Sequence, residues 1–586
     1  MPSPDSPFDT DVLIVGSGPT GATTATALAT YGVRAHVVSR FNWLADTPRA
    51  HITNQRTMEV FRDLGLEQEC LRVATPWELM GDTLFSTSLA GEELVRMRTW
   101  GTGDDRHGDY VHGSPCPLLD IPQPVVEPVI FKAAAERGAT FSFNTEYLGH
   151  EQDAEGVTAR LQDRLTGREY TLRARYLVGA DGAKSRIFEE LGLPLEGHLA
   201  RAGTVYVMFD ADLSRHVQHR PSILHWIVTP HASFGEIGMG LLRAVRPWDK
   251  WIAGWGFDIS KGEPDTSEPL LRERIRTLVG DPELEFEIER SSIWYVNQAY
   301  APQYAKGRVF CGGDAVHRHP PSSGLGLNTC VQDAFNLAWK LAYVIHGHAG
   351  PELLETYSPE RAPVGQQIVT RANQSRLDYA PLKAAFRVEG SENPVAAGIA
   401  RFKDPGPEGV KAREAVERAL TLKNTEFNAQ GVEMNQRYAS TAVIPDAGAG
   451  PEEWKRDPEL HLQATTRPGA KIPHAWLVDG RGRRVSTLDV TGQGKFSLVT
   501  GLSGHAWAEA AGELGLPWLR TVVIGRPGLL DAYCNWQRLR EIDEAGALLV
   551  RPDGIVAWRQ TNAVHDAGAA LAQLRQSLGQ VLSKPL

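Results

Sequence analysis

Three glycines near the start of the chain have the spacing of a phosphate-binding turn. Gly16, Gly18 and Gly21 form G-x-G-x-x-G directly after the apolar run at residues 12–15. The first glycine allows a tight bend, the second lets a pyrophosphate approach the backbone, and the third lets the following helix pack closely. That helix would direct its N–H groups and the positive end of its dipole at the phosphates. The pattern predicts a dinucleotide site; the alternative is a glycine turn of the same fold that binds no nucleotide.

One residue expected with this motif is absent. An acidic side chain normally stands about 20 residues further on, at the end of the second strand, where it binds the adenosine ribose. This chain has Ser39 followed by Arg40 at that place. Either the ribose contact is made differently, or the nucleotide is held mainly by its phosphates.

A second glycine-rich segment follows another apolar strand. Residues 312–329 read GGDAVHRHPPSSGLGLNT, and a helix with apolar residues at a spacing of about 3.6 is expected from Thr329. Asp314 could accept hydrogen bonds from a polyol chain, and the N-terminus of the helix could stabilise an anionic ring. A third motif, Asp181-Gly182 followed by AKSR, taken alone predicts only a turn that ends a strand.

A metal site was weighed for the same segment. Asp314, His317 and His319 could supply ligands, and H-x-H can suit a strand. No convincing further ligands or supporting partners are identifiable in the sequence. We therefore expect no metal.

Together the three motifs resemble, in order and spacing, the FAD-binding signatures of the single-component flavoprotein aromatic hydroxylases, typified by the para-hydroxybenzoate and phenol hydroxylases. Residues 48–59, 145–150, 245–248, 313–319 and 500–504 are similar to the subgroup that acts on dichlorophenol and hydroxybiphenyl. That subgroup also lacks an acidic residue at the position of Ser39. The resemblance implies an FAD-dependent monooxygenase that ortho-hydroxylates a substituted phenol to a catechol through a C4a-hydroperoxyflavin, using O2 and NADPH or NADH.

The resemblance also implies which residues contact the cofactors. Only one G-x-G-x-x-G is present, so NAD(P)H is expected to dock transiently in a surface groove, with Arg49, Arg243 and, more weakly, Trp226 as candidate contacts; their alternative is surface salt bridging. Pro320 and Ser322 are expected in the wall of the substrate pocket. The expected cofactor-binding residues are Gly16, Gly18, Gly21, Arg49, Gln123, Asp181, Gly182, Gly313, Asp314, Gly324, Gly326, Leu327 and Asn328.

The implied chemistry requires a base for the phenol. Phenol has a pKa of about 10 and histidine one of about 6.5, so a histidine oriented by a carboxylate can act as general base at neutral pH. By resemblance His51 is that base and Asp120 its carboxylate partner. Without the resemblance His51 would be read as a structural histidine of a polar loop.

The positions of these residues require an α/β fold. We expect a Rossmann-type FAD-binding domain with an interleaved β-sheet substrate domain and a C-terminal thioredoxin-like domain that lacks C-x-x-C. The FAD-binding domain is expected at 1–80, 114–200 and 300–372, and the substrate domain at 81–113 and 201–299, where several Trp residues serve either a pocket or the core. A helical connector with modest structure is expected at 373–465, and the thioredoxin-like domain at 466–586.

Composition excludes other classes of function. The 586 residues carry a net charge of -10 without a basic block, which argues against nucleic acid. No apolar run approaches the ~18 residues of a membrane span, and the N-terminus does not resemble a signal peptide, so a cytoplasmic location is expected. The five scattered cysteines indicate neither disulfides nor zinc. The thioredoxin-like domain makes a homodimer the expected assembly by resemblance.

Two other functions remain open at this stage. A flavin oxidase that inserts no oxygen into its aromatic substrate would share the fold, whereas a halogenase is disfavoured because W-x-W-x-I-P is absent. A non-catalytic binding protein is disfavoured by the intact FAD signatures.

Overall fold

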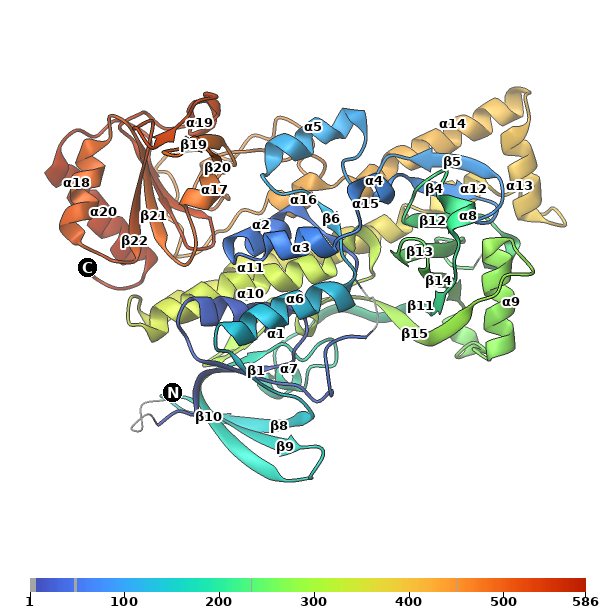
Figure 1. Ribbon diagram of the computed structural model, residues 1–586, viewed down its shortest axis with the longest axis horizontal. Coiled ribbons are helices and arrows are strands. Elements are labelled where there is room, and N and C mark those ends of the chain that lie inside the picture. Colours follow the sequence, from blue (N-terminus) through green and yellow to red (C-terminus); the bar gives the residue numbers. More distant parts are fainter. Residues whose placement is uncertain (1–6, 47–49, 233, 449) are drawn as a thin grey trace.

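A parallel sheet brings the three motifs to one edge. The computed structural model describes residues 7–46, 50–232, 234–448 and 450–586 (Figure 1). Its first sheet has the order β16-β17-β10-β1-β2-β7, in which β1 (Thr10–Val15) pairs in parallel with β2 (Ala35–Val38) and β10 (Glu169–Gly179), and β10 with β17 (Val309–Cys311). Because β1, β10 and β17 run the same way, the turns after them lie side by side. The remaining strands of this order are β7 (Thr140–Ser142) and β16 (Ala305–Lys306).

Helices cover this sheet, and a meander extends it. The helix α1 (Pro19–Thr30) packs against α10 (Gly326–Ile345) and against α6 (Gln123–Glu136). The strands β8 (Thr145–Gln152) and β9 (Val157–Asp163) run antiparallel into β10. The meander thus leads the chain back into the sheet beside β1.

A second, eight-stranded sheet lies at one end of the molecule and has the order β18-β15-β11-β14-β13-β12-β4-β5. Its longest strands are β11 (Glu196–Asp210) and β15 (Glu287–Tyr300), and α9 (Glu268–Val279) covers one of its faces. The expected strands in 81–113 are present as β4 (Thr83–Ser86) and β5 (Glu93–Met97). The same segment ends, however, in a helix, α5 (Asp104–Gly113), which two acidic residues favour at its N-terminus. The other strands are β12 (Leu224–Ile227), β13 (Gly240–Arg246), β14 (Lys250–Phe257) and β18 (His317–Arg318).

The connector contains more helix than expected. The expected helix is present as α14 (Pro407–Leu422) and α15 (Asn424–Phe427). Three further helices, α12 (Ala380–Ala385), α13 (Pro394–Lys403) and α16 (Gln430–Met434), correct the expectation of modest structure. Proline begins α13 and α14, where a missing N–H costs no helical hydrogen bond, so proline here marks the start of helices.

The C-terminal unit is a small α/β domain of thioredoxin-like type. Its sheet has the order β22-β21-β24-β25, in which β21 (Phe496–Gly501) is parallel to β22 (Leu519–Ile524) and antiparallel to β24 (Ala547–Val550). The helices α18 (His505–Leu514) and α20 (Ala567–Val581) pack together beside it, and β25 (Val556–Gln560) closes the edge. All five cysteines are free thiols.

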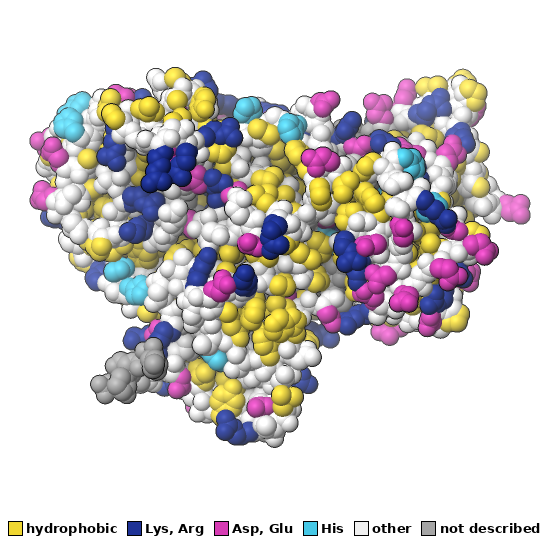
Figure 2. Space-filling model, viewed as in Figure 1, with side chains coloured by type: hydrophobic (Ala, Val, Ile, Leu, Met, Phe, Trp, Pro, Cys, Tyr) yellow, Lys and Arg dark blue, Asp and Glu magenta, His cyan; other side chains and the backbone are white. Residues whose placement is uncertain are grey.

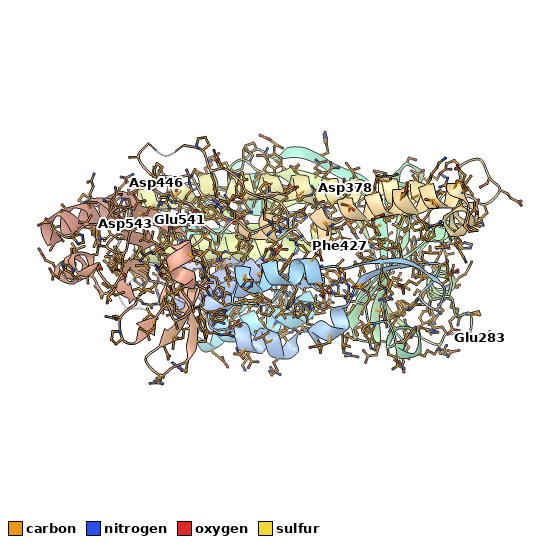
Figure 3. The ribbon with its side chains drawn as sticks, turned by 90° about the horizontal axis from the view of Figure 1, so that it is seen from above. Glu283, Asp378, Phe427, Asp446, Glu541 and Asp543 are labelled. Carbon is orange, nitrogen blue, oxygen red and sulfur yellow. The ribbon has the colours of Figure 1, made fainter. Side chains whose placement is uncertain are left out.

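The two ends of the molecule are bridged by long helices. The C-terminal unit and the eight-stranded sheet lie at opposite ends of the long axis, and α10 and α11 (Tyr357–Leu377) run between them (Figures 1 and 3). On the face shown in Figure 2, Lys and Arg are mixed with Asp and Glu. Across the described ranges no helix is both long and apolar enough to pass through a bilayer.

Candidate active site

In the turn after β1, packing requires glycine at two of the three positions. The third position faces free space. Gly16 has a φ of +108°, and a Cβ there would lie 2.1 Å from the carbonyl oxygen of Ala180. A Cβ on Gly21 would lie 1.9 Å from the carbonyl oxygen of Gly16, so α1 can approach the turn only with glycine there. A Cβ on Gly18 would meet no protein atom within 4 Å. Gly18 is the N-cap of α1 and has no side-chain cap, so space for an anionic group lies at the helix N-terminus.

The neighbouring turn after β10 is organised by Asp181. Its carboxylate accepts hydrogen bonds from Ser185 Oγ (2.5 Å) and from the backbone N–H of Arg186 (2.9 Å), at the start of α7 (Arg186–Leu191). Burial raises the pKa of Asp181, although these donors act in the opposite direction. Gly182 follows in the left-handed region with a φ of +81°. The role of both residues in cofactor binding stays a prediction.

The turn after β17 presents Asp314 beside the glycine turn. Gly313 has a φ of +65°, and a Cβ there would lie 2.3 Å from Thr20 Oγ1 of α1. The backbone N–H of Gly313 donates to Asp333 Oδ2 of α10 (3.0 Å), and this buried contact holds the turn in place. Asp314 itself is exposed. An exposed carboxylate held next to the N-terminus of α1 is suited to a hydroxyl-rich chain that continues from a pyrophosphate.

The start of α10 is locked to the strand that follows His51. Asn328 accepts from the backbone N–H of Asn54 (2.9 Å) and donates to the carbonyl oxygens of Ile52 (2.9 Å) and Gly324 (2.6 Å). The side chain of Asn328 is thus occupied by protein contacts, and Leu327 beside it is buried. At Gly326 the nearest atom to an added Cβ is His319 Cε1, at 3.6 Å. A flat group could therefore approach the N-terminus of α10 at Gly326.

A two-stranded ribbon carries the two expected catalytic residues. The strands β3 (Ile52–Thr53) and β6 (Leu119–Asp120) pair antiparallel, and the N–H of Ile121 donates to the carbonyl oxygen of His51 (2.7 Å). His51 and Asp120 are both buried. The ribbon thus brings them together from positions 69 residues apart in sequence. Their direct partnership in catalysis stays a prediction.

Gln123 begins α6 directly after the ribbon. Its N–H donates to the carbonyl oxygen of Ala50 (2.8 Å) and its Nε2 to Glu127 Oε1 (2.6 Å). Arg49, the other expected cofactor contact in this region, lies outside the described residues. The contacts of Gln123 position the loop that precedes the ribbon, and its contact with a flavin stays a prediction.

Asp120 forms a buried ion pair with Arg243 of β13. Arg243 Nη2 donates to Asp120 Oδ1, and Thr75 Oγ1 donates to Oδ2 (3.2 Å). Burial raises the pKa of Asp120 and lowers that of Arg243, and each charge opposes the shift of the other. The alternative interpretation of Arg243 as part of a surface salt bridge is wrong, because the pair is buried. It joins the ribbon to the eight-stranded sheet; contact of Arg243 with NAD(P)H stays a prediction.

Two aromatic residues share the face of Arg243: Tyr206, which the sequence did not single out, and Trp294, one of the tryptophans expected to serve either a pocket or the core. In the strand register Tyr206 of β11 lies opposite Gly254 of β14, which lies opposite Leu241 of β13. Arg243 is two residues after Leu241, so its side chain lies on the same face as that of Tyr206. The rings of Tyr206 and Trp294 meet edge to face with centroids 5.4 Å apart. The alternation of residues along β11 indicates that Tyr206 lies on one face of a strand. Which strands lie beside it is shown only by the register of the sheet.

The remaining expected residues of the pocket lie around these elements. Trp226 is on the same face but is buried against Tyr379, with centroids 4.9 Å apart. Pro320 is buried, and its carbonyl oxygen is bonded to His319 Nδ1 (2.8 Å), whereas Ser322 starts the short turn before α10. Their roles as pocket walls stay predictions.

The two histidines of the H-x-H segment, His317 and His319, have protein partners. His317 Nε2 bonds Asp333 Oδ2 (2.9 Å) in a fully buried pair, and Arg361 Nε donates to the other oxygen of Asp333 (2.7 Å). Burial raises the pKa of Asp333, but Arg361 and His317 outweigh it and hold the pKa below its usual value. This group supports the turn at Gly313 from within the core.

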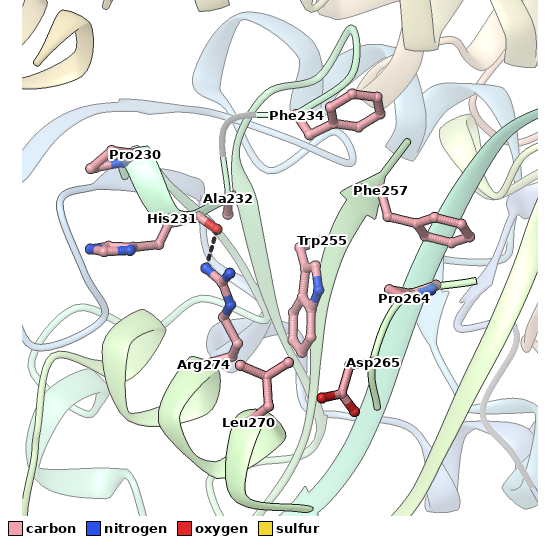
Figure 4. Close-up of a pocket in the computed structure, with 11 residues that line it drawn as sticks. Pro230, His231, Ala232, Phe234, Trp255, Phe257, Pro264, Asp265, Leu270 and Arg274 are labelled. Carbon is pink, nitrogen blue, oxygen red and sulfur yellow. Dashed lines mark hydrogen bonds between the residues drawn. The ribbon is translucent and has the colours of Figure 1, made fainter. Parts of the chain in front are cut away.

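A pocket of about 260 Å³ lies on the opposite face of the eight-stranded sheet (Figure 4). Trp255 lines it together with Phe257 and Arg274, and Arg274 Nη1 donates to the carbonyl oxygen of His231 (2.5 Å). Trp255 is one residue beyond Gly254 and so points away from Arg243 and Tyr206. This pocket is therefore separate from the ribbon.

Comparisons with known proteins agree with this geometry. Residues 9–372 match the family described as FAD binding domain, and residues 465–585 match the C-terminal domain of aromatic-ring hydroxylases. The chain is 49% identical to 2,4-dichlorophenol 6-monooxygenase of Cupriavidus pinatubonensis, over 98% of this chain and 97% of that protein. It is 46% identical to phenol 2-monooxygenase of a Pseudomonas species, over 97% of this chain and 93% of that protein.

A solved structure is similar along the whole chain. The flavin-dependent monooxygenase PieE in complex with FAD and substrate superimposes with a TM-score of 0.92 at 42% identity, covering 99% of this chain and 100% of that one. The open glycine turn, the exposed Asp314 and the start of α10 fit FAD in their arrangement. The chain belongs to the family of FAD-dependent aromatic-ring hydroxylases, because it contains first the FAD-binding domain and then the C-terminal domain of that family.

Proposed function

We propose that this enzyme ortho-hydroxylates a substituted phenol to a catechol. The balanced reaction consumes one phenol, one O2, one NAD(P)H and one proton, and yields the catechol, NAD(P)+ and water. The observation that carries the proposal is the buried ribbon, which holds His51 and Asp120 between the FAD motifs and the face of Arg243. The relatives named 2,4-dichlorophenol 6-monooxygenase and phenol 2-monooxygenase are 49% and 46% identical, whereas one named putative polyketide hydroxylase is 34% identical.

The residues of this chain have defined tasks in that reaction. Bound FAD would supply the reduced centre that activates O2, held by the glycine turn, Asp314 and the N-terminus of α10. His51 takes the proton of the phenol hydroxyl, which makes the ring carbon ortho to it electron-rich. The ion pair of Asp120 with Arg243 fixes the ribbon against the sheet. The apolar face with Tyr206 and Trp294 excludes water and packs against the ring.

The finer expectations belong to this proposal. NAD(P)H is proposed to dock transiently, with Arg243 and Arg49 as candidate contacts. A cytoplasmic homodimer is proposed as the working form, supported by the free cysteines and by the C-terminal domain.

A single assay separates this function from the flavin oxidase. The purified yellow protein is supplied with NADH or NADPH and a series of phenols under 18O2, and the products are analysed by mass spectrometry. We expect one phenol to stimulate NAD(P)H oxidation and to gain one labelled oxygen beside its hydroxyl. Oxidation of the phenol itself with release of an equal amount of peroxide, without NAD(P)H consumption and without labelled product, would instead identify an oxidase of the aromatic substrate.

A further inference from the structure

One helix lies between the catalytic ribbon and the C-terminal unit. The helix α2 (Gln55–Asp63) presents Arg56, Glu59 and Arg62 at a spacing of three residues, which places them along one side. Each of the three contacts a different part of the C-terminal unit. The contacts are Arg56 Nη2 to the carbonyl oxygen of Asp553 (2.8 Å), Lys471 Nζ to Glu59 (2.9 Å), and Arg62 Nε to Asp489 (2.6 Å).

Glu59 is the buried centre of these contacts. Its Oε1 accepts from both Lys471 Nζ (2.9 Å) and Ser114 Oγ (2.8 Å), and its Oε2 accepts from Arg56 Nη1 (3.1 Å). Burial raises the pKa of Glu59, but Lys471 and Arg56 outweigh it, so the carboxylate is charged at neutral pH. Because Lys471 is also buried, Glu59 depends on it for charge compensation.

Both strands of the ribbon are attached to this centre. On one side, α2 continues directly from β3, with Asn54 as its N-cap. On the other, Ser114 accepts from the N–H of Cys116 (3.2 Å), and Gln55 Nε2 donates to the carbonyl oxygen of Cys116 (2.8 Å), three residues before β6 begins. A displacement of Glu59 would therefore move the attachment points of β3 and of β6 together.

We propose that Lys471 of the thioredoxin-like domain is a positioning residue for the active site. It holds Glu59, and through α2 and Ser114 it fixes the ribbon that carries His51 and Asp120. The C-terminal domain thus contributes to hydroxylation without touching substrate. The catalytic consequence rests on the proposed function of His51, whereas the mechanical consequence does not.

The test uses the full-length FAD-loaded enzyme with Lys471→Met, and Lys471→Arg as the conservative variant. Arg559→Met is the matched control, because Arg559 of the same unit forms a mostly buried ion pair with Asp446 of the connector (2.6 Å) but makes none of the α2 contacts given above. Hydrogen exchange is measured at the amides of Ile121 and Gln123, which bond His51 and Ala50 across the ribbon. Peroxide released per NAD(P)H consumed and FAD content are measured in parallel.

In Lys471→Met we expect exchange at these amides to be about tenfold faster and the peroxide fraction to rise severalfold, with FAD content unchanged. In Lys471→Arg the exchange rates and the peroxide fraction should be close to those of the wild type. Arg559→Met should alter neither the exchange rates nor the peroxide fraction. Wild-type exchange in Lys471→Met, or an equal acceleration in Arg559→Met, would overturn the proposal.

A second variant covers the case in which Lys471→Met does not fold. Ser114→Ala keeps the ion pair and removes the two hydrogen bonds of Ser114 Oγ, the one that it donates to Glu59 and the one that it accepts from the N–H of Cys116. Faster exchange at Ile121 supports the proposal, and unchanged exchange refutes it. Hydrogen exchange needs no substrate. If the wild-type enzyme forms no catechol, the proposed function fails, yet the exchange data still decide the role of Lys471.

Discussion

At the scale of single residues, the glycine turn separates packing from ligand binding. Gly21→Ala places a Cβ 1.9 Å from a backbone oxygen, so we expect it to destabilise the protein by about 1–3 kcal/mol or more. Gly18→Ala meets no protein atom within 4 Å, so we expect unchanged unfolding of the FAD-free protein but FAD affinity reduced about tenfold. Urea unfolding of the apoprotein and titration with FAD distinguish the two. Equal FAD affinity in Gly18→Ala and wild type would count against this binding turn.

His51 makes a prediction about the substrate as well as the enzyme. His51→Ala should retain FAD but hydroxylate an un-ionised phenol about 10²- to 10⁴-fold more slowly, because proton removal loses its general base. The defect should shrink as the pH approaches about 10, where phenol ionises by itself. It should also shrink with an acidic nitrophenol at neutral pH. Stopped-flow measurement of product formation checks both, and coupled turnover of phenol at the wild-type rate would rule out His51 as the base.

At the scale of elements, α16 carries a buried carboxyl that makes stability depend on pH. Burial raises the pKa of Glu433 to about 8, with only the charge of Arg106 opposing it. In the unfolded chain the group has a pKa near 4.5. Between these values the folded state binds the extra proton, so stability falls as the pH rises, by up to about 1.4 kcal/mol per pH unit from this group.

Glu433→Gln removes this titration while keeping a similar shape. We expect the variant to gain stability over wild type progressively from pH 5 to pH 8, measured as the difference in unfolding free energy in urea. Below about pH 4.5 Glu433 is protonated in the folded and in the unfolded wild type. The difference in unfolding free energy between variant and wild type should therefore be smallest there and no longer change with pH. A difference that does not change with pH would show that Glu433 is ionised in the folded protein.

The elements show how far the sequence alone could lead. The motifs around Gly16, Asp181 and Asp314 were correctly placed at the ends of strands because apolar strands followed by glycine are local patterns. The sequence predicts a helical connector but not the extent of α12, α13 and α16, because proline, which is typical of turns, also occupies the first turn of α12 and α13. The ion pair of Arg551 could not be predicted, because its buried partner Glu360 lies 191 residues away and leaves no local pattern. The same reason hid Lys471 and Tyr206, whose neighbours are set by tertiary packing.

At the scale of the whole molecule, the C-terminal unit is built onto the FAD-binding domain. Trp339 and Tyr343 of α10 belong to the same buried core as Phe496 of β21, and the rings of Trp339 and Phe496 are 5.7 Å apart. The helix whose N-terminus is proposed to face the flavin therefore ends in the core of the C-terminal domain. We infer that the two domains unfold together.

Arg551 offers the sharpest test of that cooperativity. It donates to Glu360 Oε1 (2.6 Å) and Oε2 (2.8 Å) of α11, and Lys340 of α10 donates to the same carboxylate (2.8 Å), all fully buried. In wild type, FAD release and proteolytic cleavage within 465–586 should share one urea midpoint. Arg551→Met leaves a buried carboxylate with one cation fewer, so we expect a loss of about 3–5 kcal/mol in the free energy of unfolding and cleavage at lower urea than FAD release.

Arg483→Met, at an exposed pair in the same unit, should leave both midpoints unchanged. Coincident midpoints at wild-type stability in Arg551→Met would mean that the hydrophobic core of α10 alone couples the domains.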